Sequence, residues 1–400
     1  MTAPLASGGL GFSDANAGSV YSTYASSVWT GAIFGGRIAD RWLGQYRSVL
    51  LGGMFIVLGQ FTLAVAASSS FYTGLILIVI GTGLLKPNVS TLVGSLYELE
   101  DDRRDVAFSI FYMGINLGGF IGPLTAGYLA QRAGWRVGFA IAGLGMTVGL
   151  IQYILGTSRL SPALKRIAGF KQHRSLTRRT VRPPLTSAER RRVSAIILLL
   201  IFAAVFWGAY EQAGSTLNLF ADRYVRLNVF NLSLPSTWFQ AVPSLIVIVL
   251  GPVFAWLWMP LGDHAPSSQT KFGFGLLFAG LAFLWLVPAG LRAQFDGARV
   301  SPLWLLGFYI VLDCGEMCLS PVGLSLVTKL APVKLAGLMM GIWFLASAIG
   351  SKAAGFAAGL SETIPLAHLF LWTAGVCLMA AFMMFAVSKP VSKLIGLTRP

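Results

Sequence analysis

The sequence has few charged residues for its length. Of its 400 residues, 11% are Asp, Glu, Lys or Arg, whereas a soluble globular protein carries about 25%. Hydrophobic residues make up 55% of the chain. The shortage of charge excludes an ordinary soluble domain and predicts a protein that crosses a membrane many times.

Cysteine and catalytic motifs are equally scarce. The three cysteines, Cys314, Cys318 and Cys377, lie in apolar segments without metal or disulfide spacing, so we interpret them as core residues. No catalytic triad or metal cluster is present, and GTGLLK lacks the second Gly and the Ser/Thr of a phosphate-binding loop. We therefore expect neither enzyme activity nor a cofactor. The first 17 residues contain no Lys or Arg and no apolar core, so no cleavable signal is predicted.

Eleven apolar runs are long enough to span a bilayer. Backbone groups in lipid need internal partners, and the runs are too long and too little alternating for strands, so we expect an all-α polytopic protein. The predicted spans are 18–36, 48–67, 71–93, 107–130, 137–156, 193–220, 237–259, 272–290, 302–327, 335–358 and 366–387.

The positive charge is unevenly distributed over the connecting loops. Of the 30 Lys and Arg residues, 22 fall in alternate loops and the tail, and six fall in the opposite loops. This asymmetry predicts a plasma membrane protein, in bacteria of the inner membrane, with the 157–192 loop and the C-terminus in the cytoplasm. Nucleic-acid binding is the rival interpretation of the basic 157–192 loop, and we set it aside because the charge follows the topology.

The same basic loop divides the chain into a first half (1–156), a cytoplasmic linker (157–192) and a second half of six spans (193–400). Many transporters consist of paired repeats, often of six spans each. Five spans followed by six therefore look like this architecture with its first helix absent. In the loop GGRIADRWLGQYRS, we expect Asp40 to pair with Arg41 and Arg47 across the helix ends, as a gate motif.

Three ionisable residues lie inside apolar spans: Lys86, Glu211 and Glu316. A charge at mid-bilayer costs about 2.5–3.5 kcal/mol on insertion scales, so such residues usually face an aqueous cavity and mark a substrate or ion pathway. The alternative is a buried salt bridge that only ties helices together. Because the three residues lie on well-separated spans, we favour a shared cavity.

The neighbours of these charges supply further candidates. Trp207 precedes Glu211 by four residues, so both share a helix face, and a carboxyl shielded by an indole is a candidate for proton uptake near neutral pH. Asp313 precedes Glu316 by three residues, and two such close carboxyls tend to share a proton.

Three more side chains are candidates for lining the cavity. Tyr112 and Asn116 also share a helix face, and Trp343 lies among small residues. The alternative role of Asn116 is a hydrogen bond between helices, and the alternative role of Trp343 is packing in the core. Lys352 lies near the end of its span and is expected to reach the surface.

Seven segments in this order, GGRIADRWLG, GTGLLKPNVS, FSIFYMGINLG, FWGAYEQAGS, WFQAVPSLIVIVLGPVFAWLW, GEMCLSPVGLS and MMGIWFLASAIG, resemble the proton-dependent oligopeptide transporter (POT/PTR) family of the major facilitator superfamily. The resemblance implies symport of small peptides with protons by alternating access, driven by the proton gradient and performed by a monomer. It places Lys86 near the peptide carboxylate, Asn116 and Glu316 near the peptide amino end, and Trp207 and Trp343 in side-chain pockets. It makes Glu211 a proton-linked gate.

The chain also departs from the family pattern. Nothing matches the E-x-x-E-R motif of the family's first helix. Pro243 replaces a ligand-contacting Asn, Trp29 replaces a common Tyr, and Asp313 and Lys352 add charges. Two alternatives follow: a truncated protein that does not transport, or the same fold with another small organic solute.

Overall fold

The structure is a computed structural model. It describes residues 1–2, 9–65, 68–97, 103–161, 163–167, 185–229, 232–258, 260–261, 266–297, 299–332 and 336–395. The following statements concern these residues.

Five long helices make up the first half. They are α1 (Asp14–Ile38), α2 (Gln45–Leu63), α3 (Ser68–Ser95), α4 (Arg103–Ala133) and α5 (Trp135–Leu155), and a short π-helical turn, Ala39–Leu43, follows α1. The described residues of 157–167 are also helical, so the predicted linker begins as a helix. Its central part, 168–184, lies outside the described residues.

The second half begins with α7, whose start is fixed by a capping box between Thr186 and Glu189. The helices of this half are α7 (Ser187–Tyr210), α8 (Thr216–Tyr224), α9 (Val242–Trp258), α10 (Ser268–Phe295), α11 (Leu303–Leu330), α12 (Ala336–Leu360) and α13 (Leu366–Ile395). Two 3-10 turns, Glu211–Gly214 and Ser236–Gln240, and a hairpin of β1 (Asn228–Val229) and β2 (Leu232–Ser233) complete it.

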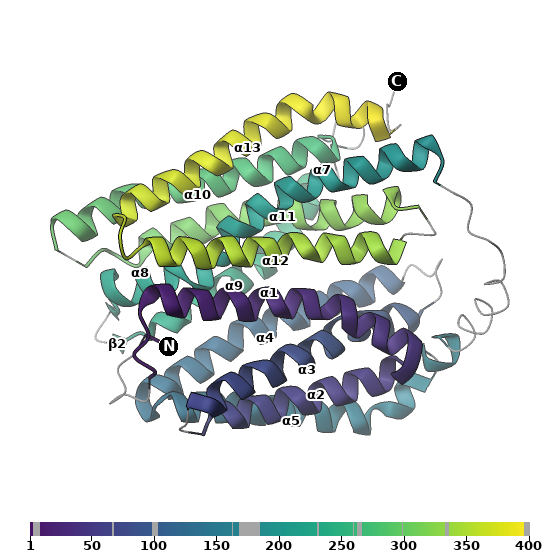
Figure 1. Ribbon diagram of the computed structural model, residues 1–400, viewed down its shortest axis with the longest axis horizontal. Coiled ribbons are helices and arrows are strands. Elements are labelled where there is room, and N and C mark those ends of the chain that lie inside the picture. Colours follow the sequence, from purple (N-terminus) through teal and green to yellow (C-terminus); the bar gives the residue numbers. More distant parts are fainter. Residues whose placement is uncertain are drawn as a thin grey trace.

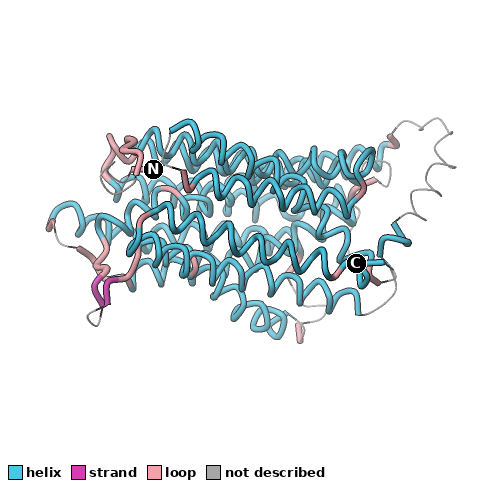
Figure 2. The backbone as a smooth tube through the Cα atoms, turned by 90° about the horizontal axis from the view of Figure 1, so that it is seen from below, coloured by secondary structure: helices cyan, strands magenta, loops and turns pink. Residues whose placement is uncertain are grey.

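The two halves lie one above the other in Figure 1, with α1 to α5 below and α7 to α13 above. Across the boundary α1 packs against α12, and α4 packs against α9. Figure 2 shows the helices running along the same general direction, with the hairpin at one end. Helix α7 begins and α13 ends at the opposite end in Figure 1.

Ten of the described helices are long and apolar enough to cross a membrane. They correspond to ten of the eleven predicted spans, and the exception is 18–36. That segment forms α1, which carries a run of hydroxyl side chains such as Ser22, Thr23 and Thr30. Helix α1 packs against both α3 and α12, and Ser22 is buried while Thr23 is exposed.

The halves are packed differently. The second half has a continuous core of buried aromatic and aliphatic side chains, with Phe206, Phe283 and Phe308 fully buried. In the first half, α2 and α3 meet backbone to backbone: a Cβ on Gly52 would lie 2.6 Å from the carbonyl oxygen of Gly81. Small residues permit such close approach in membrane bundles.

Candidate substrate and proton site

Lys86 and Glu211 both contact one indole ring, that of Trp29 in α1. The Nε1–H of Trp29 donates to Oε1 of Glu211 at 3.3 Å, and the Lys86 ammonium lies 3.4 Å from the centroid of the Trp29 ring. Lys86 comes from α3 in the first half, and Glu211 from the second. The structure thus brings two of the three predicted charges together, through a residue that was not predicted as part of the site.

Local backbone features place Glu211 at this boundary. Helix α7 ends at Tyr210, and Glu211 opens a 3-10 turn. A Cβ on Gly350 of α12 would lie 2.7 Å from Trp207, so the glycine lets α12 press against this end of α7. Ser351 of α12 is therefore a neighbour of Glu211. Lys86 also interacts electrostatically with Glu211.

Asp313 and Glu316 form a second acidic site on α11. Asp313 is fully buried and Glu316 is 9% exposed. Both carboxyl oxygens of Asp313 and Oε2 of Glu316 lack a hydrogen-bond partner among the described residues. The Tyr210 side chain interacts electrostatically with both carboxyls, and Tyr309 interacts with that of Asp313. A pair of buried carboxyls without a cation is suited to holding a proton or receiving an ammonium group.

Tyr112 of α4 faces this acidic pair from the other half, because it interacts electrostatically with Glu316 and Asp313. Asn116 donates from Nδ2 to the carbonyl oxygen of Tyr112 at 2.9 Å. This hydrogen bond lies within α4, so Nδ2 of Asn116 does not form the bond between helices that was the alternative role of this residue.

The two tryptophans predicted to line pockets differ in their surroundings. Trp207 is half-buried, and its ring lies 6.4 Å from Trp29 and 5.3 Å from Tyr210. It thus connects the Glu211 site to the acidic pair. Trp343 is 5% exposed and packs against Phe272 and Gly323 inside the core of the second half. Its predicted substrate contact stays a prediction.

The gate motif after α1 has a different partner from the one predicted. Oδ1 of Asp40 accepts a hydrogen bond from Nε2 of Gln45 at 2.8 Å, and among the described residues no ion pair joins it to Arg41 or Arg47. Arg41 instead lies over the Trp42 ring at 5.3 Å. The π-helical turn brings the amide of Gln45, at the start of α2, to the carboxylate, and the pairing of Asp40 with Arg41 and Arg47 stays a prediction.

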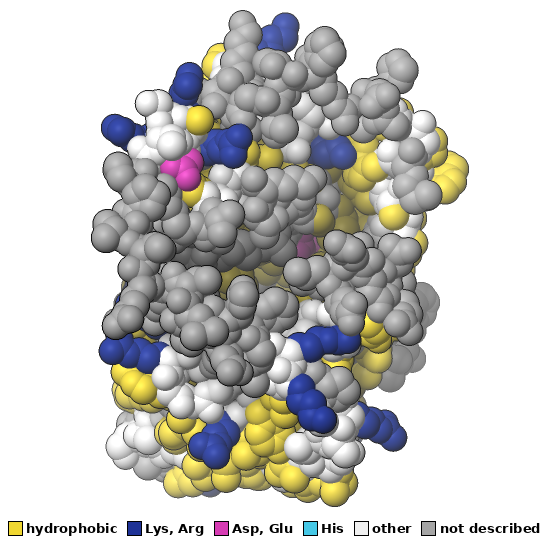
Figure 3. Space-filling model, turned by 90° about the vertical axis from the view of Figure 1, so that its right-hand side faces the viewer, with side chains coloured by type: hydrophobic (Ala, Val, Ile, Leu, Met, Phe, Trp, Pro, Cys, Tyr) yellow, Lys and Arg dark blue, Asp and Glu magenta, His cyan; other side chains and the backbone are white. Residues whose placement is uncertain are grey.

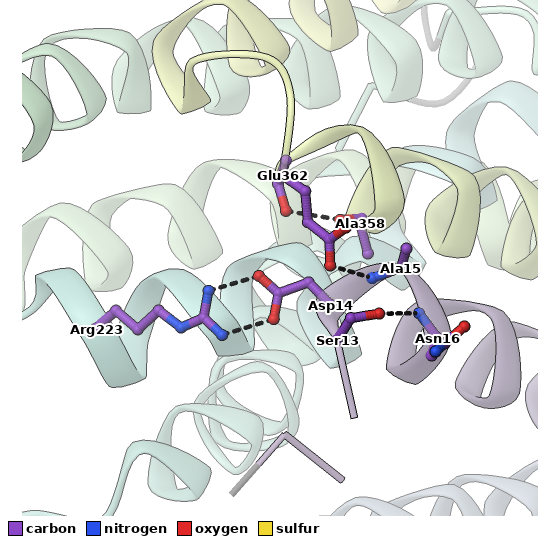
Figure 4. A network of polar contacts seen from close by, with 8 residues as sticks. Ser13, Asp14, Ala15, Asn16, Arg223, Ala358 and Glu362 are labelled. Carbon is purple, nitrogen blue, oxygen red and sulfur yellow. Dashed lines mark hydrogen bonds and ion pairs between the residues drawn. The ribbon is translucent and has the colours of Figure 1, made fainter. Parts of the chain in front are cut away.

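At the hairpin end, a polar network that the sequence did not suggest joins the halves (Figure 4). Asp14, at the start of α1, accepts two hydrogen bonds from the guanidinium of Arg223, at 2.5 and 2.6 Å. The Ala15 amide donates to Glu362 at 2.8 Å. We call these contacts the end latch. Asp14 and Arg223 are 209 residues apart, so no local pattern could predict them.

Figure 3 views the end opposite the hairpin, and it shows a shaded hollow with an acidic side chain inside it and Lys and Arg side chains around it. Lys86 is an exposed residue although its ammonium touches Trp29. The charged site therefore borders space that is open to solvent.

A family model described as the POT family matches residues 46–165 and 170–389. The chain belongs to the POT family. It is 34% identical to the peptide transporter YePEPT of Yersinia enterocolitica, with 100% of this chain and 90% of the relative covered. It is 33% identical to a di-/tripeptide transporter of Lactococcus lactis, with 97% and 89% covered.

Solved structures of POT family members have the same fold. A peptide transporter POT in complex with sulfate has a TM-score of 0.89 and 33% identity, with 98% of this chain and 90% of that chain covered. A POT family transporter in complex with 5-aminolevulinic acid has a TM-score of 0.88 and 28% identity, with 98% and 91% covered. These likenesses confirm the all-α transporter fold with several membrane-spanning helices.

Proposed function

We propose that this POT family member is a proton-coupled symporter that carries di- and tripeptides into the cell by alternating access. One observation carries the proposal: a cation of the first half and a carboxylate of the second share Trp29 at the boundary between the halves. The names of the relatives support the same substrate class. The proton gradient is the energy source, and neither an enzymatic step nor a cofactor is required.

The ends of the peptide are the groups for the site to recognise. The ammonium group is received by Glu316, which has an unpartnered buried oxygen, with Tyr112 and Asn116 nearby on α4. The carboxylate is received by Lys86, whose ammonium lies over the Trp29 ring and can donate further hydrogen bonds to an anion. Trp207 and Trp343 line the space for side chains.

Protonation of a carboxyl couples the gradient to the motion. Glu211 and Glu316 are the principal acceptors, with Asp313 next to Glu316. A proton on Glu211 removes the charge that attracts Lys86 across the boundary, and the halves are then freer to rock around the bound peptide. The end latch holds one end shut while the other is open, as alternating access requires.

The orientation follows from the loop charges. The C-terminus and the 157–192 loop are cytoplasmic, because 22 of the 30 Lys and Arg residues lie on that side. The hollow end is then the cytoplasmic end, and the end latch is external. The protein acts as a monomer in the bacterial inner membrane.

Uptake by purified protein in liposomes tests the proposal. With an inward-directed proton gradient, labelled di-alanine is expected to accumulate above equilibrium, and a protonophore is expected to abolish the accumulation. Protein-free liposomes are the control. Absence of uptake contradicts the proposal.

A second cargo is favoured by one observation, since Pro243 is buried at the start of α9 where the family pattern has a ligand-contacting Asn. Uptake of labelled 5-aminolevulinic acid tests this cargo. If excess unlabelled di-alanine does not inhibit that uptake, the transported solute is a small amino acid rather than a peptide.

A further inference from the structure

Among the described residues, Trp29 is a side chain that contacts both Lys86 and Glu211. Its N–H serves the carboxylate and its ring face serves the ammonium. No direct ion pair joins Lys86 to Glu211 in the described part of the chain, so the indole stands between the two charges. An indole offers both functions at once because its N–H lies in the ring plane and its negative face lies above it.

The ring is also held by its aromatic neighbours. Phe344 of α12 stacks on it at 5.9 Å with an interplanar angle of 18°, and Trp207 lies at 6.4 Å. Trp29 therefore has a defined orientation, to which the hydrogen bond to Glu211 adds a charge-dependent restraint. The other polar groups that face Glu211 are Ser351 of α12 and Tyr21 of α1.

We propose that Trp29 is a positioning residue that couples the proton on Glu211 to the availability of Lys86 for the substrate carboxylate. The inference rests on the symport proposed above. When Glu211 is ionised, its charge-assisted hydrogen bond fixes the indole and keeps the ring face on Lys86. When a proton from the external solution binds a Glu211 oxygen, this bond weakens, and Lys86 is released to the substrate.

The coupling is reciprocal. A substrate carboxylate that draws Lys86 away from the ring removes one of the contacts that hold Trp29 against Glu211. Substrate binding therefore favours proton uptake by Glu211 to the same extent. The proton later leaves the same oxygen on the cytoplasmic side, and no other covalent bond changes. Affinity for the peptide is therefore expected to be higher at low pH.

Trp29→Phe tests the proposal because it keeps an aromatic ring for Lys86 and removes the N–H that donates to Glu211, together with the rest of the pyrrole part of the indole. Trp285→Phe is a matched control, since it removes an indole N–H that donates to the carbonyl oxygen of Trp304 at 3.0 Å, outside the proposed site. Binding of di-alanine to the purified full chain is measured at pH 6 and pH 8. In the wild type the affinity is expected to rise by about fivefold or more at pH 6, a usual size for coupling between sites.

In Trp29→Phe this ratio is expected to fall to within about twofold, and in Trp285→Phe it is expected to persist. Glu211→Gln is expected to remove the ratio as well, and addition of Trp29→Phe to it should then change nothing further. Incorporation of benzothienylalanine at position 29, an isostere of Trp without the N–H, replaces Trp29→Phe if that variant does not give a monodisperse protein.

Three outcomes overturn the inference. The first is a wild-type pH ratio in Trp29→Phe, and the second is an affinity that drops equally at both pH values, which indicates a purely structural role. In both cases the wild type still binds di-alanine, so the proposed function stands. The third, no binding of di-alanine by the wild type at either pH, overturns the proposed function and the inference with it.

Discussion

The two carboxyl sites of the second half differ in what opposes their charge. Glu211 lies at the boundary and has a donor and a cation from the first half. Asp313 and Glu316 lie deeper on α11, and three of their four carboxyl oxygens have no partner among the described residues. A site that depends on the other half is suited to sensing the relative position of the halves. A site whose carboxyl oxygens accept no hydrogen bond from the described residues is suited to receiving a ligand.

Neutral variants of the two glutamates should separate these roles, with the largest effects expected here. Both Glu211→Gln and Glu316→Gln are expected to abolish concentrative uptake. Glu316→Gln should in addition weaken peptide binding by about 10- to 100-fold, because a hydrogen bond to a charged group contributes about 1.5–3 kcal/mol. Glu211→Gln should leave binding at low pH within about threefold of the wild type.

Gradient-driven uptake and equilibrium binding in the same preparations measure the two effects. Asp296→Asn, which neutralises an exposed carboxyl just after α10, is the matched control. Full concentrative uptake by Glu316→Gln would remove that residue from the coupling mechanism.

Lys86→Gln sharpens the comparison from the side of the first half. The variant is expected to lose the preference for a free carboxyl end, so that di-alanine and di-alanine amide compete equally. In the wild type, the amide should compete at least about tenfold less well, since one charge-assisted contact is lost. Competition against labelled di-alanine measures the preference. If Lys86→Gln still discriminates, the carboxylate binds elsewhere.

Asp313→Asn probes the unpartnered site through stability. An amide at this buried position has no charge to desolvate, so the variant is expected to raise the apparent melting temperature in detergent by a few degrees, corresponding to about 1–3 kcal/mol. Asp222→Asn is the control, because that carboxyl accepts a hydrogen bond from Ser236 and gains nothing by neutralisation. A lower melting temperature for Asp313→Asn would indicate a partner that the carboxylate needs.

Much of the fold could be predicted from the sequence, since hydrophobic length alone locates ten of the eleven spans and charge asymmetry separates the loops. The three buried charges were found because an ionisable residue in an apolar run is conspicuous. Trp29 was noticed only as a departure from a family pattern, because a tryptophan in a membrane helix gives no sign of what it touches.

Other contacts depend on tertiary structure that no local pattern encodes. Asp40 pairs with Gln45 because a π-helical turn, rather than the expected loop, follows α1. Tyr210 reaches the acidic pair on α11 only because α7 and α11 pack together. The Asp14–Arg223 pair bridges the two halves at one end.

The smallest effect is expected from a change in the end latch. This change also allows the two ends of the molecule to be compared. Arg223→Ala removes a bidentate pair, but the Arg223 side chain is 42% exposed, so solvent screening limits the expected loss to about 0.5–1 kcal/mol. The closed external end should then open more often, with a two- to fivefold shift at about this energy. A cysteine in place of Ser22, a buried residue of α1 that packs against Gly355 of α12, reports the opening by its rate of labelling with an impermeant thiol reagent.

Arg226→Ala is the matched control, because Arg226 is an exposed arginine three residues further along. The double variant Asp14→Arg/Arg223→Asp should restore slow labelling, since the exchanged charges can pair again. Equal labelling of the Arg223→Ala and Arg226→Ala proteins would show that the close packing of α1 on α12 keeps this end closed without the ion pair. In that case the asymmetry between the two ends arises from small residues at the helix contact rather than from charge.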